Sequence, residues 1–266
     1  MKRICLCLLC VSLLLSVLCG CQAEPDAGSS PADLPSKEQD PGINASTLTE
    51  HSFSDGEITL GYLLYTPKNA ADGMPLLVYL HGGSGKGADL SLLTANDGFP
   101  KYLTKGELGD VPTYVLIPQL PSTYTVWEKI KATLIALIDA VGDACGTDAD
   151  RISLTGHSMG GTGVWSIAVA YPQKFSCIAP MSGSITATKA HLNALASMPI
   201  RAFVGSADTV VDPAKTETFI AALKEINSNA TLTVLDGVTH QNVPARAYLN
   251  TSYHVIDWLL SNSRGA

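Results

Sequence analysis

The sequence predicts an α/β fold, with a mostly parallel central sheet that carries helices on both faces. Short apolar runs alternate along the chain with amphipathic helical segments, the pattern typical of a parallel sheet. The runs Leu76–Leu80 and Tyr114–Ile117 are apolar throughout, as expected for strands covered on both faces. The 266 residues are 46% apolar and 15% charged, which supports one sizeable domain with an appendage.

The first twenty residues have the pattern of an export signal. Lys2 and Arg3 precede the apolar run Ile4–Leu18, which is short for a membrane span and typical of a signal peptide. The run ends in Leu18-Cys19-Gly20-Cys21, which resembles the lipobox of bacterial lipoproteins. That resemblance implies removal of residues 1–20 and a diacylglycerol on Cys21, which would anchor the protein to the bacterial membrane surface. The alternative is an ordinary signal peptide that is rich in cysteine.

The next segment, residues 21–46, is expected to be a flexible tether. It is rich in proline, serine and acidic residues and has almost no large apolar side chain, so it cannot bury a core. The globular domain is therefore predicted to span residues 47–266.

Within this domain the elements are expected in alternating order. Strands are predicted at 58–65, 76–80, 114–117, 151–154, 177–180, 200–204 and 231–235. Helices are predicted at 130–141, 159–170, 191–198 and 213–223, and in a last segment ending at 255–260. Residues 98–111 show the least regular pattern and are expected to form a surface loop.

Charge and cysteine content narrow the possible functions and the environment. The formal charge is −7, and without Lys2 and Arg3 of the signal segment it becomes −7 − 2 = −9, which leaves no basic surface for nucleic acid. Only Cys145 and Cys177 lie in the domain. They could pair in an exported protein, although two separate buried thiols fit their sequence context better.

The motif Gly156-His157-Ser158-Met159-Gly160-Gly161 lies between a predicted strand and a predicted helix. This is G-x-S-x-G in a strand–turn–helix context, where a tight turn exposes the serine and nearby backbone leaves room only for glycine. Ser158 is therefore the candidate nucleophile, and it needs a base and an oriented anion site.

With its flanks ADRISLT and TGVWSIAVAYPQKFSCIAPMSG, this motif resembles the α/β-hydrolase superfamily. Within the superfamily, the chain is similar to small bacterial carboxylesterases grouped with feruloyl and acetylxylan esterases and with prolyl-oligopeptidase-like hydrolases. The similarity extends from about Leu64 to Leu260. It implies the α/β-hydrolase fold and a serine, acid and histidine in that chain order.

The acid is expected at Asp208, which follows the strand 200–204 and precedes a Val-Val pair, as in the superfamily. It would accept the Nδ1–H of the histidine and stabilise the imidazolium. Asp212 is the competitor, and its place before Pro213 is typical of a helix N-cap.

The base is expected at His240, in a loop after the last strand. His51 and His191 follow no strand, and His254 falls within the predicted last helix. His157 is expected to point away from the reaction centre, and His81 to brace its loop. Related esterases often carry a tryptophan soon after this histidine, whereas here the sequence continues Gln241-Asn242-Val243.

Acyl transfer builds negative charge on the carbonyl oxygen, and backbone N–H groups can stabilise it. One donor is expected at Met159, at a helix N-terminus. The other is expected in the loop His81-Gly82-Gly83, with Gly83 preferred and Gly82 or Ser84 left open. Trp127 resembles a pocket tryptophan of related esterases but is equally compatible with the core.

The sequence shows neither metal-ligand spacing nor a dinucleotide fingerprint, so no cofactor and no metal are expected. The expected function is cleavage of carboxylic esters through an acyl-enzyme, on a small ester or on an esterified plant polysaccharide. The short connection before Asp208 leaves no room for a large lid, so an open site is expected. The alternatives are a prolyl-oligopeptidase-like peptidase and an inert, glycan-binding surface lipoprotein.

Overall fold

The computed structural model describes residues 45–96 and 98–265. The predicted signal peptide, the lipidation site Cys21 and all but the last two residues of the predicted tether lie outside these ranges. No helix in the described ranges is both long enough and apolar enough to cross a bilayer.

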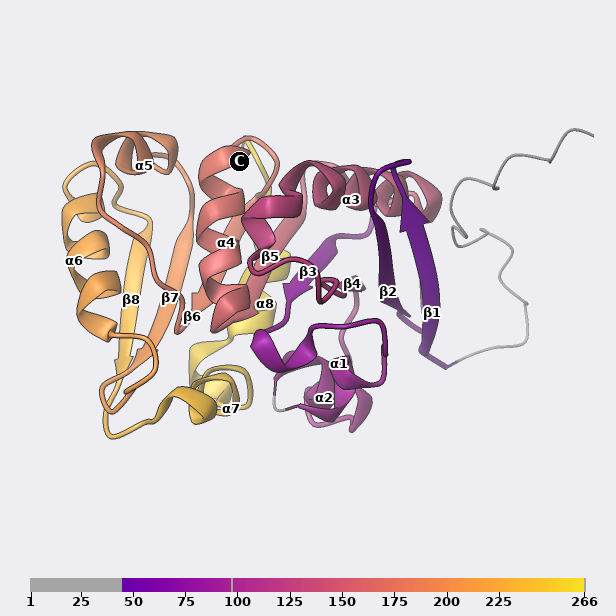
Figure 1. The fold of residues 1–266 in the computed structure, drawn as a ribbon, viewed down its shortest axis with the longest axis horizontal. Helices are drawn as coiled ribbons and strands as arrows, with labels where there is room; N and C mark the ends of the chain where they lie inside the picture. Colours follow the sequence, from indigo (N-terminus) through magenta and orange to yellow (C-terminus); the bar gives the residue numbers. More distant parts are fainter. Residues whose placement is uncertain (1–44, 97, 266) are drawn as a thin grey trace, which may run out of the picture. The chain divides into compact units, whose positions relative to one another are not determined.

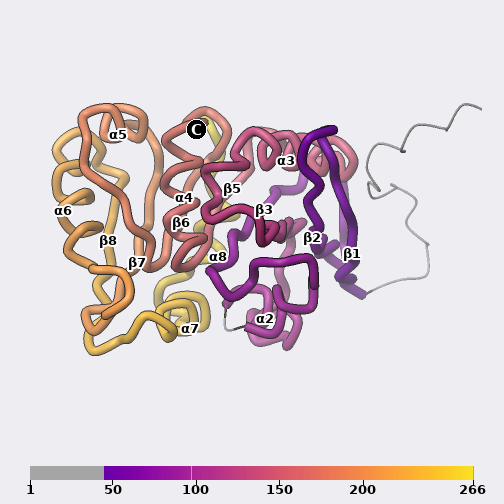
Figure 2. Tube along the Cα trace, in the orientation of Figure 1, coloured from indigo at the N-terminus to yellow at the C-terminus, as the bar shows by residue number. Residues whose placement is uncertain are grey.

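An eight-stranded sheet forms the centre of the described residues, with the order β1-β2-β4-β3-β5-β6-β7-β8 (Figure 1). The strands are β1 (Thr47–Ser54), β2 (Thr59–Thr66), β3 (Leu76–Leu80), β4 (Tyr114–Pro118), β5 (Ile152–His157), β6 (Cys177–Met181), β7 (Ile200–Gly205) and β8 (Ala230–Leu235). β1 pairs with β2 and β2 with β4 in antiparallel register, and all other pairs are parallel. Figure 2 shows β1 and β8 at opposite ends of the sheet.

Eight α-helices connect and cover these strands in the described part of the chain. They are α1 (Leu92–Ala95), α2 (Phe99–Thr104), α3 (Lys131–Cys145), α4 (Met159–Ala170), α5 (Lys189–Ala194), α6 (Pro213–Lys224), α7 (Val243–Tyr248) and α8 (Val255–Ser261). Short 3-10 turns are found at η1 (Gly83–Gly85), η2 (Trp127–Ile130), η3 (His240–Asn242) and η4 (Thr251–Tyr253).

The central strands bury both faces because alternate side chains enter two separate cores. Leu76 and Val78 pack with apolar residues of α3, α4 and α6 on one face. Leu77 and Tyr79, from the same strand, pack with residues of α1, α2, α7 and α8 on the other face. This arrangement confirms the predicted α/β class with helices on both faces of a mostly parallel sheet.

The structure corrects three sequence-based expectations. Residues 98–111 are not simply a surface loop, because they contain α2, whose Phe99 is completely buried. The strand β1 had no counterpart in the prediction. His254 does not lie inside the last helix: it is the N-cap of α8, with a φ of 45°.

The two domain cysteines, Cys145 and Cys177, are buried as separate thiols. The structure therefore agrees with the prediction of two separate buried thiols, which the sequence context favoured over a disulfide.

Candidate active site

The turn between β5 and α4 holds Ser158 in a strained backbone conformation. Its φ of 59° and ψ of −120° lie in a region that residues with a side chain rarely occupy. Its backbone N–H donates to the carbonyl of Met181 on β6, at 3.0 Å, which ties the turn to the neighbouring strand. Strain of this kind persists only where the surrounding structure enforces it, and it is often found at functional sites.

Two glycines make this turn possible through close packing against β3. A Cβ atom at Gly160 would lie 1.9 Å from the carbonyl oxygen of Leu80, and a Cβ at Gly156 would lie 2.5 Å from the same atom. A backbone oxygen cannot move aside as a flexible side chain can. The spacing of glycines in the motif thus follows from the approach of α4 to β3.

His240, in η3 after β8, lies beside the serine. Its Nε2 is 2.8 Å from Oγ of Ser158, and its Nδ1 is 2.7 Å from Oδ2 of Asp208. The carboxylate can only accept, so Nδ1 carries a hydrogen and Nε2 is free to accept the hydroxyl hydrogen of the serine. The structure therefore brings the three predicted side chains into one hydrogen-bonded line.

Asp208 is held as a buried carboxylate. Its side chain is fully buried, and its Oδ1 accepts hydrogen bonds from the backbone N–H groups of Val210 and Val211, each at 2.9 Å. Burial alone would raise the pKa of this carboxyl, but the hydrogen bonds from Val211, His240 and Val210 outweigh it and hold the pKa below its usual value. Asp208 is thus a charged acceptor near neutral pH.

Asp212 has the other role that its sequence position indicated. It is the N-cap of α6, and its Oδ1 accepts from the backbone N–H of Ala214 at 3.0 Å.

Backbone donors for an oxyanion are available next to the serine. Met159 is the first residue of α4, where N–H groups have no acceptor within the helix. On the other side, Gly82 approaches the nucleophile most closely, since a Cβ there would lie 3.4 Å from Cβ of Ser158 and 4.0 Å from its Oγ. A Cβ at Gly83 would meet nothing within 4 Å, so the glycine loop is open at this point.

His81 braces the glycine loop, as the sequence suggested. Its Nε2 accepts the backbone N–H of Leu120 at 2.9 Å, and its carbonyl accepts the indole N–H of Trp127 at 3.1 Å. Trp127 is completely buried and packs in the core, which favours the core position over the pocket role among its two predicted alternatives.

His157 differs from expectation. It does not point away from the site but lies against His240, with ring centroids 4.7 Å apart and its Nε2 2.9 Å from the His240 carbonyl oxygen. Ser182 was also missed: it is buried directly after β6 and adopts a φ of 45°. Neither placement has a sequence signal, because both depend on how β5, β6 and the segment after β8 meet.

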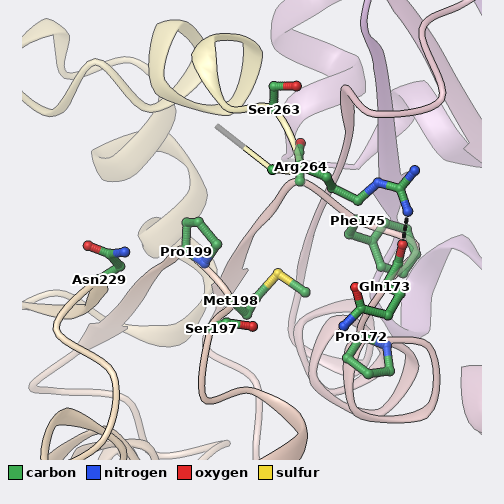
Figure 3. Close-up of a pocket in the computed structure, with 11 residues that line it drawn as sticks. Pro172, Gln173, Phe175, Ser197, Met198, Pro199, Asn229, Ser263 and Arg264 are labelled. Carbon is green, nitrogen blue, oxygen red and sulfur yellow. Dashed lines mark hydrogen bonds between the residues drawn. The ribbon is translucent and has the colours of Figure 1, made fainter.

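A separate cavity of about 280 Å³ lies near the amino ends of β6, β7 and β8, where Ser176, Pro199 and Asn229 line it. Figure 3 shows Arg264 at this cavity, donating to the carbonyl of Gln173. The three residues of the hydrogen-bonded line all follow the carboxyl ends of their strands, so this cavity belongs to the opposite edge of the sheet. No cluster of metal-ligating side chains occurs in residues 45–96 or 98–265.

Comparison with known proteins agrees with this geometry. The family model described as Phospholipase/Carboxylesterase matches residues 120–248, a range that contains Ser158, Asp208 and His240. Among solved structures, a thermostable esterase is 26% identical, with a TM-score of 0.69, and the match covers 82% of this chain and 63% of that chain. The chain thus spans less than two thirds of that esterase. A search of curated proteins finds no matching sequence.

Two more distant structures share the fold. The feruloyl esterase module from Clostridium thermocellum is 16% identical, with a TM-score of 0.63 and coverage of 88% of this chain and 96% of that chain. An S-formylglutathione hydrolase from Agrobacterium tumefaciens is 14% identical, with a TM-score of 0.61 and coverage of 88% and 100%. Together with the family match, these structures confirm the α/β-hydrolase fold. The match to the Phospholipase/Carboxylesterase model favours an ester hydrolase.

Proposed function

We propose that this chain is a serine esterase that cleaves carboxylic esters through an acyl-enzyme on Ser158. The observation that carries the proposal is the hydrogen-bonded line from Ser158 through His240 to Asp208, which starts at a strained turn between β5 and α4. A hydroxyl is a weak nucleophile, and this line supplies the base and the group that orients the base.

In the proposed reaction, Oγ of Ser158 attacks the ester carbonyl carbon while Nε2 of His240 takes the hydroxyl proton. Asp208 stabilises the resulting imidazolium through Nδ1. The oxyanion of the tetrahedral intermediate accepts hydrogen bonds from Met159 N–H and from the glycine loop, with Gly83 or Gly82 as the donor. Collapse breaks the bond to the alcohol, which leaves with the proton from His240. Water then attacks the acyl-enzyme with the same base and releases the acid and Ser158.

We further propose that the enzyme acts on short acyl groups. The cavity beside the glycine loop, which Gly82, His157 and Tyr79 help to line, has a volume of only about 40 Å³, and neither Ser158 nor His240 lines it. This cavity is therefore not an acyl pocket at the nucleophile. An aromatic acyl group such as feruloyl would have to lie on the open side of the serine. The connection between β6 and β7 contains only the short helix α5 in the described chain. Figure 1 shows α5 at the opposite ends of the strands from α7, which directly follows His240, so α5 does not cover the site.

The proposal includes the location of the enzyme. Residues 1–20 would be removed as a lipoprotein signal, and a diacylglycerol on Cys21 would hold the protein at the bacterial membrane surface through the tether 21–46. Replacing Cys21 with serine should move the protein from the membrane fraction to the soluble fraction, whereas equal membrane association of both proteins would refute the anchor.

The function is tested by hydrolysis of nitrophenyl acetate, methyl ferulate and a dipeptidyl arylamide. Wild-type protein is compared with Ser158→Ala and with Ser166→Ala, a matched serine within α4 that is half-buried. We expect turnover of nitrophenyl acetate, slower turnover of methyl ferulate, loss of both in Ser158→Ala and retention in Ser166→Ala.

Two results would replace the esterase proposal by the alternatives. Cleavage of the arylamide with little esterase activity would favour a peptidase. A folded protein that cleaves none of the three substrates but binds polysaccharide would favour the inert glycan-binding reading.

A further inference from the structure

His157 directly precedes the serine and contacts the histidine of the site. It is the last residue of β5, only 9% exposed, and its Nε2 lies 2.9 Å from the main-chain carbonyl oxygen of His240. The two imidazole rings are 4.7 Å apart and inclined at 41°. One residue thus connects the strand that carries the nucleophile to the turn that carries the base.

The chemistry of this contact fixes the hydrogen positions. A carbonyl oxygen only accepts, so Nε2 of His157 must carry a hydrogen. Burial, together with the electrostatic effect of the neighbouring His240, lowers the pKa of His157 to about 4. His157 is therefore a neutral donor near pH 7 and adds no positive charge beside the imidazolium that forms on His240.

The His240 carbonyl accepts a second hydrogen bond, from the backbone N–H of Val243 at the end of η3. The bond from Val243 is local to the turn, whereas the bond from His157 ties the turn to β5. Asp208 orients the imidazole ring through Nδ1. Asp208 thus holds the His240 side chain through Nδ1, and His157 holds the His240 main chain through the carbonyl oxygen.

We propose that His157 is a positioning residue, whose hydrogen bond to the main chain of His240 keeps Nε2 of His240 within reach of Ser158. This inference rests on the proposed function. His157 takes no proton from the substrate and acts only through His240. Since a misplacement of about 1 Å can cost about a hundredfold in rate, loss of this bond should lower kcat more than it alters KM.

The test compares three substitutions. His157→Phe keeps the ring but removes the donor, His157→Asn has an amide too short to reach, and His157→Gln places an amide N–H close to the position of Nε2. We expect Phe and Asn to lower kcat for nitrophenyl acetate about tenfold to a hundredfold with KM little changed, and Gln to restore most of the loss. Thermal unfolding of each variant reports folding, and the Asn and Gln pair decides the outcome if the Phe variant does not fold.

Two further readouts separate this inference from the esterase proposal. The rate at which a fluorophosphonate labels Ser158 measures activation of the serine without any ester, and it should fall in the same order. The proton NMR signal of the hydrogen bond between Nδ1 of His240 and Asp208 needs no reaction, and it should shift in Phe and Asn but not in Gln. A wild-type protein that is labelled but hydrolyses no ester would contradict the esterase proposal alone. Unchanged labelling and an unchanged signal in Phe and Asn, or an equal loss in Gln, would overturn the positioning role.

Discussion

The two aspartates that follow β7 show how place along the chain decides the role of a carboxylate. Asp208 lies at the end of the strand, fully buried, and receives the histidine and two backbone N–H groups. Asp212, four residues later, caps α6 at its exposed end. The same side chain therefore supports the base in one position and a helix in the other.

These roles give opposite expectations for the same substitution. Asp208→Asn should lower kcat by about a thousandfold or more, because an amide no longer stabilises the imidazolium and can favour the wrong tautomer. Asp212→Asn should leave kcat and stability nearly unchanged, since asparagine caps helices about as well as aspartate. Ester hydrolysis and thermal unfolding of both variants check this, and similar losses of kcat in the two would count against the assignment of Asp208.

The three candidate residues could be identified from the sequence because each lies in a recognisable local pattern. Ser158 lies in a G-x-S-x-G turn, and Asp208 and His240 each follow a strand. No local pattern indicates the role of His157, since that role depends on a contact with His240, 83 positions later in the chain. The choice between Gly82 and Gly83 likewise depends on how the loop folds over the serine.

The contact between α4 and β3 limits which residues the turn between β5 and α4 can contain. A methyl group at Gly160 would meet the Leu80 carbonyl at 1.9 Å. Gly160→Ala should therefore destabilise the protein by about 3 kcal/mol or more, at or beyond the upper end of ordinary overpacking.

A second helical glycine provides the matched control. A Cβ at Gly142, in α3, would approach only the side-chain oxygen of Thr147, at 3.2 Å. Gly142→Ala should leave stability unchanged or raise it by up to about 1 kcal/mol through helix propensity. Urea unfolding of both variants measures the difference, and equal effects would show that close packing does not constrain the turn between β5 and α4.

Helix α2 was missed because residues 98–111 are rich in glycine and charge and show no clear helical period. Phe99 nevertheless packs edge-on against Tyr248 of α7, with ring centroids 5.3 Å apart, and is fully buried. β1 was missed for a related reason: it is an edge strand with a single buried residue, Phe53, so its sequence shows little hydrophobic pattern.

If α2 is part of the core, Phe99→Ala should cost about 3 to 5 kcal/mol of the free energy of unfolding. Lys105→Ala, at the exposed end of the same helix, should cost far less. Chemical denaturation distinguishes the two, and a small effect of Phe99→Ala would restore the reading of this segment as a surface loop.

At the scale of the whole molecule, the parallel sheet was predictable because its central strands are apolar throughout. Their order was not, since the sequence does not state which strands are neighbours. In the observed order β3, β5 and β6 lie together, which gathers the glycine loop, Ser158 and Ser182 at one edge. The site thus follows from topology as much as from its motif.

Two buried histidines make the stability of the whole molecule depend on pH. Burial lowers the pKa of His81 and of His157 to about 4, below the ordinary value of about 6.5. Between these values the unfolded chain binds more protons than the folded one, so stability is complete above pH 6.5 and falls as the pH drops toward 4. The loss between pH 7 and pH 5 should be about 2 kcal/mol for each histidine.

Urea unfolding at pH 7 and pH 5 measures this loss. His157→Gln, which cannot titrate, should show about half of the wild-type difference. A variant that keeps the full difference would mean that His157 does not contribute.

During catalysis, Ser158 is expected to carry the acyl group of the ester. Acid quenching of the protein during turnover of nitrophenyl acetate, followed by digestion and mass spectrometry of the peptides, tests this covalent step. We expect the added mass of one acetyl group on the peptide that contains Ser158, and none on that peptide in Ser158→Ala. An acetyl group on a different residue, or rapid turnover with no acylated serine, would contradict the role of Ser158 as the nucleophile.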